Sequence, residues 1–273
     1  PEVALINNIG PAHIEGFGSI DGVARAKGEI YAGLPEAGIA VVNNDDKYAH
    51  FWDDILAQKP QIRFSSASAK TKVYAEHIQM HQRGGSSFQL VTPSGNTQIN
   101  LKVPGRHHIQ NALAAASCAE ALGTSLESIA KGLSQFKGVV GRLTPKVTKQ
   151  GAMILDDTYN ANLSSVLAGI DVLRSFEGKR VLVLGDMGEL GENTQAHHEA
   201  VGSAAADAGL EILLTCGKAS LAATHAFGKQ AQHFNDQKAL ADALTPMLDD
   251  ATTVLVKGSR SSAMEKVVER LLE

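Results

Sequence analysis

Short apolar runs that alternate with segments of helical period constrain the fold of this chain more than any other feature. In the first half, predicted helices at residues 20–32 and 48–56 separate apolar runs at residues 3–9, 39–43 and 62–65. In the second half, Ala-rich or amphipathic segments separate four more apolar runs, at residues 152–157, 180–186, 211–217 and 252–258. Strands that are apolar throughout are buried on both faces, and their alternation with helices is typical of a parallel sheet. The pattern therefore predicts two α/β units.

Between about residues 72 and 103 the period of the pattern changes to two. Three alternating stretches are separated there by turn-forming sequences, RGG at residues 83–85 and PSGN at residues 93–96. This period predicts an antiparallel patch of sheet in the first unit.

Length and composition favour two domains of ordinary globular type. A chain of 273 residues is long for one hydrophobic core, and a short polar connection follows Pro145. We place the domains at residues 1–146 and 147–273. The chain is 44% hydrophobic and 20% charged, and its formal charge of −4 gives no basic footprint for nucleic acid.

The sequence also carries expectations about compartment. No run of about 18 apolar residues occurs, so we expect no membrane insertion. No leader-like segment opens the chain, and Cys118 and Cys216 lack disulfide or metal spacing. We therefore expect buried reduced thiols in a cytoplasmic protein.

A histidine and a carboxylate, His13 and Glu15, follow the first apolar run within the stretch IGPAHIEGFGS. Functional groups of open α/β sheets gather at the carboxyl ends of strands, and glycines allow close approach to the backbone. On this pattern alone, a catalytic role and a structural role for His13 both remain open.

Lys27 lies in the next predicted helix, four residues after Val23 and four before Tyr31. This spacing places Lys27 on the inward stripe of the helix, which Ser19 is predicted to cap. A buried lysine is costly unless it is paired or chemically altered. The alternative is an aliphatic stem on apolar surface with its ammonium group in water.

The stretch PGRHHIQNALAAA opens the first of two further predicted helices, at residues 108–122 and 125–136. Asn111 would either contact a ligand at the helix N-terminus or belong to a capping network. His107 and His108 are adjacent, so they would point about 100° apart on a helix, which disfavours a two-histidine metal site.

Polar side chains also follow strands of the second unit. Arg142, near the predicted boundary, would be either solvated or a clamp for phosphate oxygens. Two strand ends carry the other candidates: Asp157, Tyr159 and Asn160 after the first strand, and Lys257, Ser259 and Arg260 after the last. The last group would hold a substrate carboxylate or phosphate, or would be an ordinary polar strand end.

Two nucleotide-binding fingerprints are absent from the sequence. The first strand of the second unit is not followed by G-x-G-x-x-G, and LGDMGELG at residues 184–191 has a different spacing after the second strand. The sequence also contains no G-x-x-x-x-G-K-[ST] phosphate loop. A nicotinamide-dependent dehydrogenase is therefore only a weak alternative.

Six motifs in this order and spacing resemble the Mur ligases, the ATP-dependent amino-acid ligases of peptidoglycan synthesis. They are NNIGPAHIEGFGSIDGVARAKGEI, PGRHHIQNALAAA, GVVGRL, DDTYNAN, LGDMGELG and VKGSRS. The resemblance covers essentially the whole chain. It implies the later part of a mononucleotide-binding ATPase domain followed by a Rossmann-like domain, without the family's uridine-nucleotide domain and phosphate loop. A chain of this extent is expected to be inactive by itself.

The resemblance also implies the chemistry and the catalytic residues. The reaction would be carboxylate activation by ATP with Mg²⁺, in the branch that joins D-alanyl-D-alanine to a UDP-N-acetylmuramoyl-tripeptide. His13 would lie near a magnesium ion and the acyl-phosphate, and Lys27 would be carbamylated by CO2 and would bind magnesium as a carbamate. Arg142 would reach the ATP phosphates across the interdomain cleft. Glu15 belongs to the same motif, and a direct metal role for it stays open.

The remaining site residues also follow from the resemblance. Asn111 would contact adenine, and Asp157 would bind the ribose within the cofactor-binding motif that includes Tyr159 and Asn160. His108 departs from the family, which carries Asn there. Lys257, with Ser259 and Arg260, would bind substrate.

Other functions stay open beside this one. The chain would otherwise belong to another Mur ligase, to a folylpolyglutamate-synthase-like amide ligase, or to a non-catalytic nucleotide-binding module. We expect a monomer whose partners are the two peptide substrates. The sequence does not distinguish diaminopimelate from lysine in the tripeptide.

Overall fold

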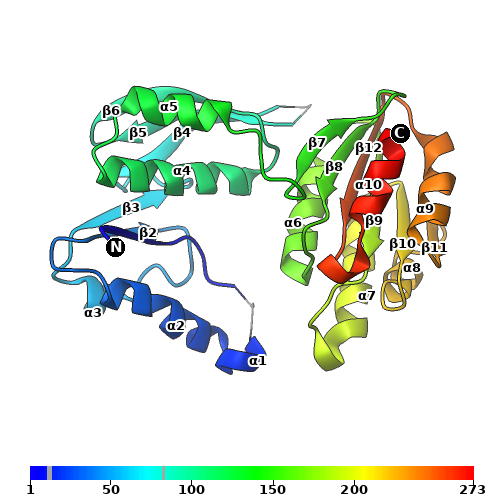
Figure 1. Cartoon of the computed structure of the whole chain (residues 1–273), viewed down its shortest axis with the longest axis horizontal. Helices are drawn as coiled ribbons and strands as arrows, with labels where there is room; N and C mark the ends of the chain where they lie inside the picture. Colours follow the sequence, from blue (N-terminus) through cyan, green and yellow to red (C-terminus); the bar gives the residue numbers. More distant parts are fainter. Residues whose placement is uncertain (11–13, 82–83) are drawn as a thin grey trace. The chain divides into compact units, whose positions relative to one another are not determined.

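Two α/β units, each with its own six-stranded sheet, make up the part of the chain that the structure describes (Figure 1). The structure is a computed structural model, and it describes residues 1–10, 14–81 and 84–273. The predicted fold class is confirmed, because both sheets are mostly parallel and the first contains an antiparallel patch. Within these described ranges, no helix is long and apolar enough to cross a membrane.

Internal contacts separate the two units close to residue 137. The first unit consists of Pro1–His81, Gly85–Lys102 and Arg106–Phe136. Lys137–Glu273 form the bulk of the second unit. The domain boundary between residues 146 and 147 stays a prediction.

The first unit contains one sheet whose strands lie side by side in chain order. Its first four strands run parallel, and the last two return antiparallel. The strands are β1 (Val3–Ile6), β2 (Ile39–Asn43), β3 (Gln61–Ser65), β4 (Val73–Met80), β5 (Ser86–Thr92) and β6 (Gly95–Leu101). The helices are α1 (Ile14–Phe17), α2 (Ile20–Ala32), α3 (Asp53–Leu56), α4 (Arg106–Ala121) and α5 (Leu126–Gln135).

Helices α2 and α4 cover opposite faces of the parallel strands, as Figure 1 shows. Ser19 caps α2 as predicted, since its Oγ accepts a hydrogen bond from the Gly22 backbone N–H at 3.0 Å. Tyr31 of α2 is fully buried against β1 and β2. Its hydroxyl donates to the Val41 carbonyl at 2.6 Å and accepts from the Ile6 N–H at 3.1 Å. These bonds attach α2 to the two strands whose ends form the candidate site.

Two predicted elements of the first unit are shorter than expected. The first strand ends at Ile6 rather than at residue 9. The helix predicted at residues 48–56 is only α3, because Asp46 draws the preceding chain into a turn through a 2.8 Å bond from the Tyr48 N–H.

The second unit contains a sheet in the order β11-β10-β9-β12-β8-β7, parallel except for the pair β7–β8. The strands are β7 (Thr144–Val147), β8 (Met153–Asp157), β9 (Lys179–Gly185), β10 (Ile212–Cys216), β11 (Ala231–Phe234) and β12 (Thr252–Lys257). The α-helices are α6 (Leu163–Arg174), α7 (Thr194–Asp207), α8 (Leu221–Phe227), α9 (Gln237–Leu244) and α10 (Glu265–Leu272).

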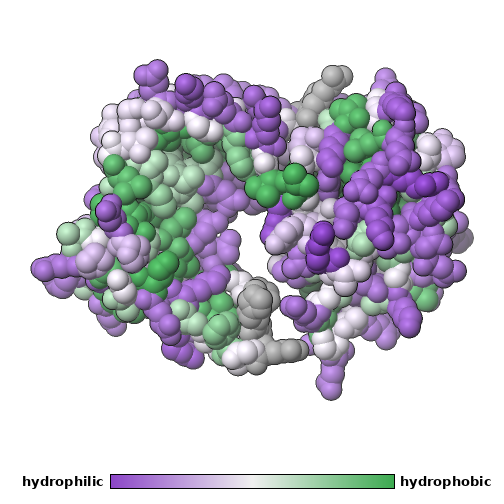
Figure 2. All heavy atoms as spheres, viewed as in Figure 1, coloured by the Kyte–Doolittle hydropathy of each residue, from purple (hydrophilic) through white to green (hydrophobic). Residues whose placement is uncertain are grey.

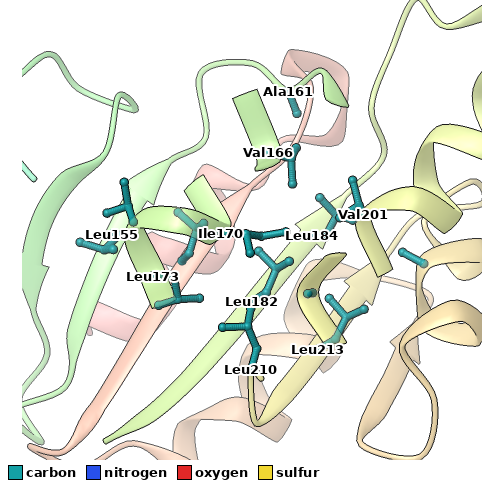
Figure 3. Packing of buried hydrophobic residues seen from close by; sticks show 14 of the residues in the cluster. Leu155, Ala161, Val166, Ile170, Leu173, Leu182, Leu184, Val201, Leu210 and Leu213 are labelled. Atoms are coloured by element: carbon teal, nitrogen blue, oxygen red, sulfur yellow. The ribbon is translucent and has the colours of Figure 1, made fainter. Parts of the chain in front are cut away.

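Successive residues of these strands face two separate cores, as strand geometry requires. Figure 3 shows one core, in which Leu155, Leu182 and Leu213 of the strands meet Ile170 of α6 and Val201 of α7. Neighbouring residues of the same strands, Ile154, Val183 and Leu214, enter the other core, against α9 and α10. The burial of both faces of this sheet explains why its central strands are apolar throughout.

The helix faces that point to solvent are mostly hydrophilic, as Figure 2 shows for α5 of the first unit and α10 of the second.

Strands β7 and β11 were not predicted from the sequence. Both lie at the edges of their sheet and are only partly buried, so they lack a continuous apolar run. Both cysteines are free thiols, and Cys118 is only half-buried whereas Cys216 is buried.

Candidate active site

In the first unit, hydrogen bonds of three asparagines connect the carboxyl ends of β1 and β2 to α4. Asn7 donates from Nδ2 to Asn111 Oδ1 at 2.8 Å, and Asn43 Nδ2 donates to the backbone carbonyl of Asn7 at 2.9 Å. The predicted residue Asn111 is exposed, so its remaining polar atoms face solvent or a ligand. These uncharged donors and acceptors suit the hydrogen-bonding edge of a heterocyclic base.

Two carboxylates shape the loop after β2. Asp45 accepts hydrogen bonds from Ser65 Oγ and from the backbone N–H and Oγ of Ser66. Burial alone would raise the pKa of Asp45, but these hydrogen bonds outweigh burial and lower it. Asp46 accepts from the Ile9 N–H at 2.9 Å and so holds the end of the chain that leaves β1.

Lys27 lies on α2 beside the chain that leaves β1, but its side chain is exposed. The prediction that it faces inward is therefore wrong. The inward stripe passes through Gly28 instead, where a Cβ atom would lie 2.5 Å from Trp52 Nε1. Lys27 Nζ donates to the Asn8 carbonyl at 3.0 Å, within an open pocket of about 580 Å³ lined also by Asn7 and Glu29.

The rings of the two histidines of α4 contact each other at a tilt of 42°, with centroids 4.3 Å apart. Burial, with a smaller contribution from the charge of His107, lowers the pKa of His108 to about 4, so His108 is neutral near pH 7. Nε2 of His108 is buried and has no hydrogen-bond partner among the described residues. The described ranges also contain no cluster of three metal-binding side chains.

His13 lies outside the described residues, so its predicted role stays a prediction. Glu15 belongs to α1, and its side chain is not among those described. The metal set predicted from the resemblance is therefore untested by the structure.

In the second unit, Arg142 sits at the tip of a turn that packs on the loop after β8. The exposed guanidinium of Arg142 lies over the ring of Tyr159, with Cζ 4.3 Å from the ring centroid. The Tyr159 N–H donates to the Gly141 carbonyl at 3.1 Å. Two predicted site residues from consecutive motifs, Arg142 and Tyr159, are thus neighbours, and Asn160 follows Tyr159 with an exposed side chain.

Lys257 and Asp157 form a buried ion pair at the carboxyl ends of β12 and β8. Lys257 Nζ donates to Asp157 Oδ2 at 2.6 Å and to the Asn160 carbonyl at 2.9 Å, and only 2% of Lys257 is exposed. Burial lowers the pKa of Lys257 and raises that of Asp157, and in each case the partner's charge opposes the effect of burial. The predicted ribose contact of Asp157 and substrate contact of Lys257 stay predictions.

The other two predicted substrate residues differ in exposure. Ser259 is buried, and its N–H donates to the Asp186 carbonyl at 2.8 Å. Arg260 is exposed and lies 3.2 Å from Glu265 Oε1. Of the two, only Arg260 projects into solvent, so it is the better placed for a charged substrate.

Sequence reasoning missed several groups that shape these sites. Asp156 is buried and pairs with Lys146 of β7 at 2.8 Å. Asp186 accepts from the N–H groups of Ala219 and Ser220, at 3.1 and 2.8 Å. The signal for the two aspartates was their position at strand ends, but nothing in the sequence indicated their partners.

Each of the two α/β units carries polar groups at the carboxyl ends of its strands, and comparison with known proteins identifies the class to which such a pair of units belongs. The chain belongs to the Mur ligase family: residues 1–119 match the Mur ligase middle domain, and residues 141–260 match the Mur ligase glutamate ligase domain. The motif-based prediction of this family is confirmed.

Individual relatives sharpen this assignment. The chain is 45% identical over 275 residues to the UDP-N-acetylmuramoyl-tripeptide–D-alanyl-D-alanine ligase of Escherichia coli (strain K12), covering 100% of this chain and 60% of that protein. It is 39% identical to the Haemophilus influenzae ligase of the same name, covering 99% of this chain and 59% of that protein. A crystal structure of MurF from Acinetobacter baumannii superimposes with a TM-score of 0.88 at 34% identity, covering 100% of this chain and 60% of that one. The chain thus spans about 60% of the length of the relatives it matches.

Proposed function

We propose that this chain forms the adenine-side and C-terminal parts of an ADP-forming ligase that joins D-alanyl-D-alanine to a UDP-N-acetylmuramoyl-tripeptide. The observation that carries this proposal is 45% identity over the whole chain to an Escherichia coli ligase of that name. We further expect a monomer in the cytoplasm and no activity of the 273 residues alone. The 273-residue chain should bind ATP only weakly, because it contains no phosphate loop.

The reaction activates a carboxylate and then forms an amide. A carboxylate oxygen of the tripeptide bonds to the γ-phosphorus of ATP as the bond to the β-phosphate oxygen breaks, which releases ADP. The dipeptide amine then attacks the acyl carbon, and the tetrahedral species expels phosphate. Positioning and charge neutralisation supply most of the catalysis in such steps.

The first unit offers groups suited to ATP and magnesium. Asn111, in the amide chain with Asn7 and Asn43, would contact adenine. A carbamate on Lys27 would supply carboxylate-like oxygens to Mg²⁺. His13 would be a second ligand of the same ion, and Glu15 is a further candidate. Lys27 fits this modification, because its amine is exposed to CO2 and a carbamate N–H would still donate to the Asn8 carbonyl.

The second unit offers groups for phosphate, ribose and the incoming peptide. Arg142 is exposed and held over Tyr159, so its guanidinium is available to phosphate oxygens. Asp157 and Asn160 would lie at the ribose. Ser259 and Arg260 would serve the peptide substrates, and Lys257, which is buried, would lie behind them.

The test uses the complete protein that carries this chain. Phosphate release from ATP should require both the tripeptide substrate and D-alanyl-D-alanine, and the product should contain the new amide bond by mass spectrometry. Turnover with a different amino acid, or with folate substrates, would assign another branch of amide ligases. ATP binding without any turnover would indicate a non-catalytic nucleotide-binding module.

The carbamate has its own test. Lys27→Ala should abolish turnover in the complete protein, and added short carboxylates should restore part of it. Lys59→Ala is the matched control, because Lys59 Nζ also donates to a backbone carbonyl in the same unit, that of Leu34 at 2.6 Å. Full activity of Lys27→Ala would contradict the assignment.

A further inference from the structure

The turn that carries Arg142 has an unfavourable backbone. Gly141 and Leu143, on either side of Arg142, have φ values of +73° and +51°. A non-glycine residue in this left-handed region costs about 1–2 kcal/mol. Leu143 is also buried, with 4% of its surface exposed. Groups outside the turn must therefore hold it in place.

Those groups come from the loop after β8. The Leu143 N–H donates to Asp157 Oδ1 at 3.3 Å, and the Gly141 carbonyl accepts from the Tyr159 N–H at 3.1 Å. A Cβ atom at Gly141 would lie 3.0 Å from that Tyr159 nitrogen, so the approach is as close as a glycine allows. The position of Arg142 thus depends on where Asp157 and Tyr159 lie.

Lys257, on the neighbouring strand, bonds to Asp157 and to the residue that follows Tyr159. Lys257 and Asp157 are paired residues of β12 and β8, and Nζ reaches both Asp157 Oδ2 and the Asn160 carbonyl. One ammonium group therefore holds the start of the loop and the carbonyl of Asn160, the residue that follows Tyr159. A buried ion pair adds little net stability over well-packed apolar residues, but the loss of one partner leaves an uncompensated charge, so both partners must stay in place.

We propose that Lys257 is a positioning residue that, through Asp157 and the Asn160 carbonyl, holds the Gly141–Leu143 turn and sets Arg142 over Tyr159. This inference rests on the proposed function, because the position of Arg142 matters for catalysis only if Arg142 binds ATP phosphates. It assigns Lys257 a role behind the site, in place of direct contact with substrate. Its burial and its two short bonds leave it shielded from a ligand.

The experiment reads the position of Arg142 directly. In the full chain, the Nε–Hε resonance of Arg142, assigned by its loss in Arg142→Lys, should be shifted upfield by the Tyr159 ring, since Cζ lies 4.3 Å from the ring centroid. Tyr159→Leu defines the unstacked position of this resonance. In Lys257→Met the resonance should move most of the way to that position. An unmoved resonance in a folded variant overturns the proposal.

Two variants keep the result interpretable. Lys146→Met breaks the neighbouring, partly buried pair with Asp156 in the same sheet, and it should leave the Arg142 resonance in place. A shift in Lys146→Met equal to that in Lys257→Met would indicate general loosening of the sheet and would overturn a specific role. If Lys257→Met does not fold, Lys257→Met/Asp157→Asn decides, because it leaves no buried unpaired charge but still lacks the bond to the Asn160 carbonyl.

An activity measurement separates this inference from the proposed function. In the complete protein, Lys257→Met should raise KM for ATP or lower kcat by about 10- to 100-fold, since small displacements of a positioned group cost that much. We expect the KM values for both peptide substrates to stay unchanged. A large rise in a peptide KM alone would assign direct substrate contact and overturn the proposal. If the complete protein has no ligase activity, the proposed function fails while the resonance shift still tests the placement.

Discussion

The two units place polar groups at the same point of their sheets, the carboxyl ends of the strands, but they hold these groups by different means. In the first unit, hydrogen bonds between uncharged amide groups connect Asn7, Asn43 and Asn111, and the side chain of Lys27 is exposed. In the second unit, a buried lysine is paired with a buried aspartate. The first arrangement leaves its cation exposed, with a hydrogen bond to the Asn8 carbonyl, whereas the second buries its cation between a carboxylate and a backbone carbonyl.

The physical reason for this difference is the cost of burying charge. An exposed ammonium group keeps its hydration and can change partner or be modified at little cost. A buried ion pair must keep both partners, because the loss of one leaves an uncompensated charge in the protein interior. A substitution at Lys257 should therefore lower the free energy of unfolding strongly, whereas a substitution at Lys27 should change it little.

The largest effect on stability is expected for Lys257→Met. Removal of the ammonium group leaves Asp157 buried without its partner, and the free energy of unfolding of the second unit should fall by about 3–5 kcal/mol. Amide hydrogen exchange in β8 and β12 measures this loss. Trp52, the only tryptophan of the chain, reports the first unit separately by its fluorescence.

The neutral pair Lys257→Met/Asp157→Asn is the control for this prediction. It should recover part of the lost stability, because an amide costs far less to bury than a carboxylate. A loss below about 1 kcal/mol in the single variant would mean that the pair behaves like a surface salt bridge, and the contrast between the units would fail.

Much of this fold could be predicted from the sequence, because it follows from local patterns. Continuous apolar runs indicated doubly covered parallel strands, and a period of two indicated the hairpins β4 to β6. The exceptions were elements that depend on distant partners. Edge strands β7 and β11 have short, mixed sequences, and they form because a neighbouring strand offers free backbone groups.

The site was predictable in its location but not in its pairings. Strand ends and the six motifs identified the candidate residues, yet Lys257 and Asp157 are separated by 100 positions, and Asn7 and Asn111 by 104. A period-based argument also placed Lys27 inward. It could not foresee that Trp52 packs at Gly28 and so rotates the buried stripe by one residue.

The second prediction concerns the first unit at high pH. Burial raises the pKa of Tyr31 to about 12, an effect that the Ile6 N–H partly opposes. A folded-state pKa above the unfolded value of about 10 means that the stabilisation is complete below pH 10 and is lost as the pH rises toward 12. The free energy of unfolding should fall by about 1.4 kcal/mol per pH unit in that window.

Urea unfolding followed by Trp52 fluorescence measures this slope, because the Tyr31 and Trp52 ring centroids are 5.6 Å apart. Tyr31→Phe should be less stable at pH 8, since two buried backbone groups lose a partner, but it should lack the steep fall above pH 10. If the same slope persisted in Tyr31→Phe, another group would be responsible. The result would show whether the first unit, despite its open site, depends on one buried polar side chain.

A third prediction tests why Lys27 is exposed. Gly28→Ala should destabilise the first unit by about 1–3 kcal/mol, because the added Cβ atom would overlap Trp52 Nε1. Gly132→Ala is the matched control, a helical glycine of α5 with nothing within 4 Å of its added Cβ. It should stabilise by about 0.5–1 kcal/mol. Equal effects at the two positions would mean that the Trp52 contact does not set the orientation of α2.

The smallest effect on stability is expected at the other lysine. Lys27→Met should change the free energy of unfolding of the first unit by no more than about 0.5 kcal/mol, because its ammonium group is exposed and donates only to the Asn8 carbonyl. Lys59→Met, which removes a partly buried donor from the Leu34 carbonyl, should cost about 1 kcal/mol. Trp52 fluorescence in urea measures both. A loss of unfolding free energy at Lys27 as large as that at Lys257 would show that both lysines are structural. It would contradict the proposal that Lys27 differs from Lys257 by serving the chemistry.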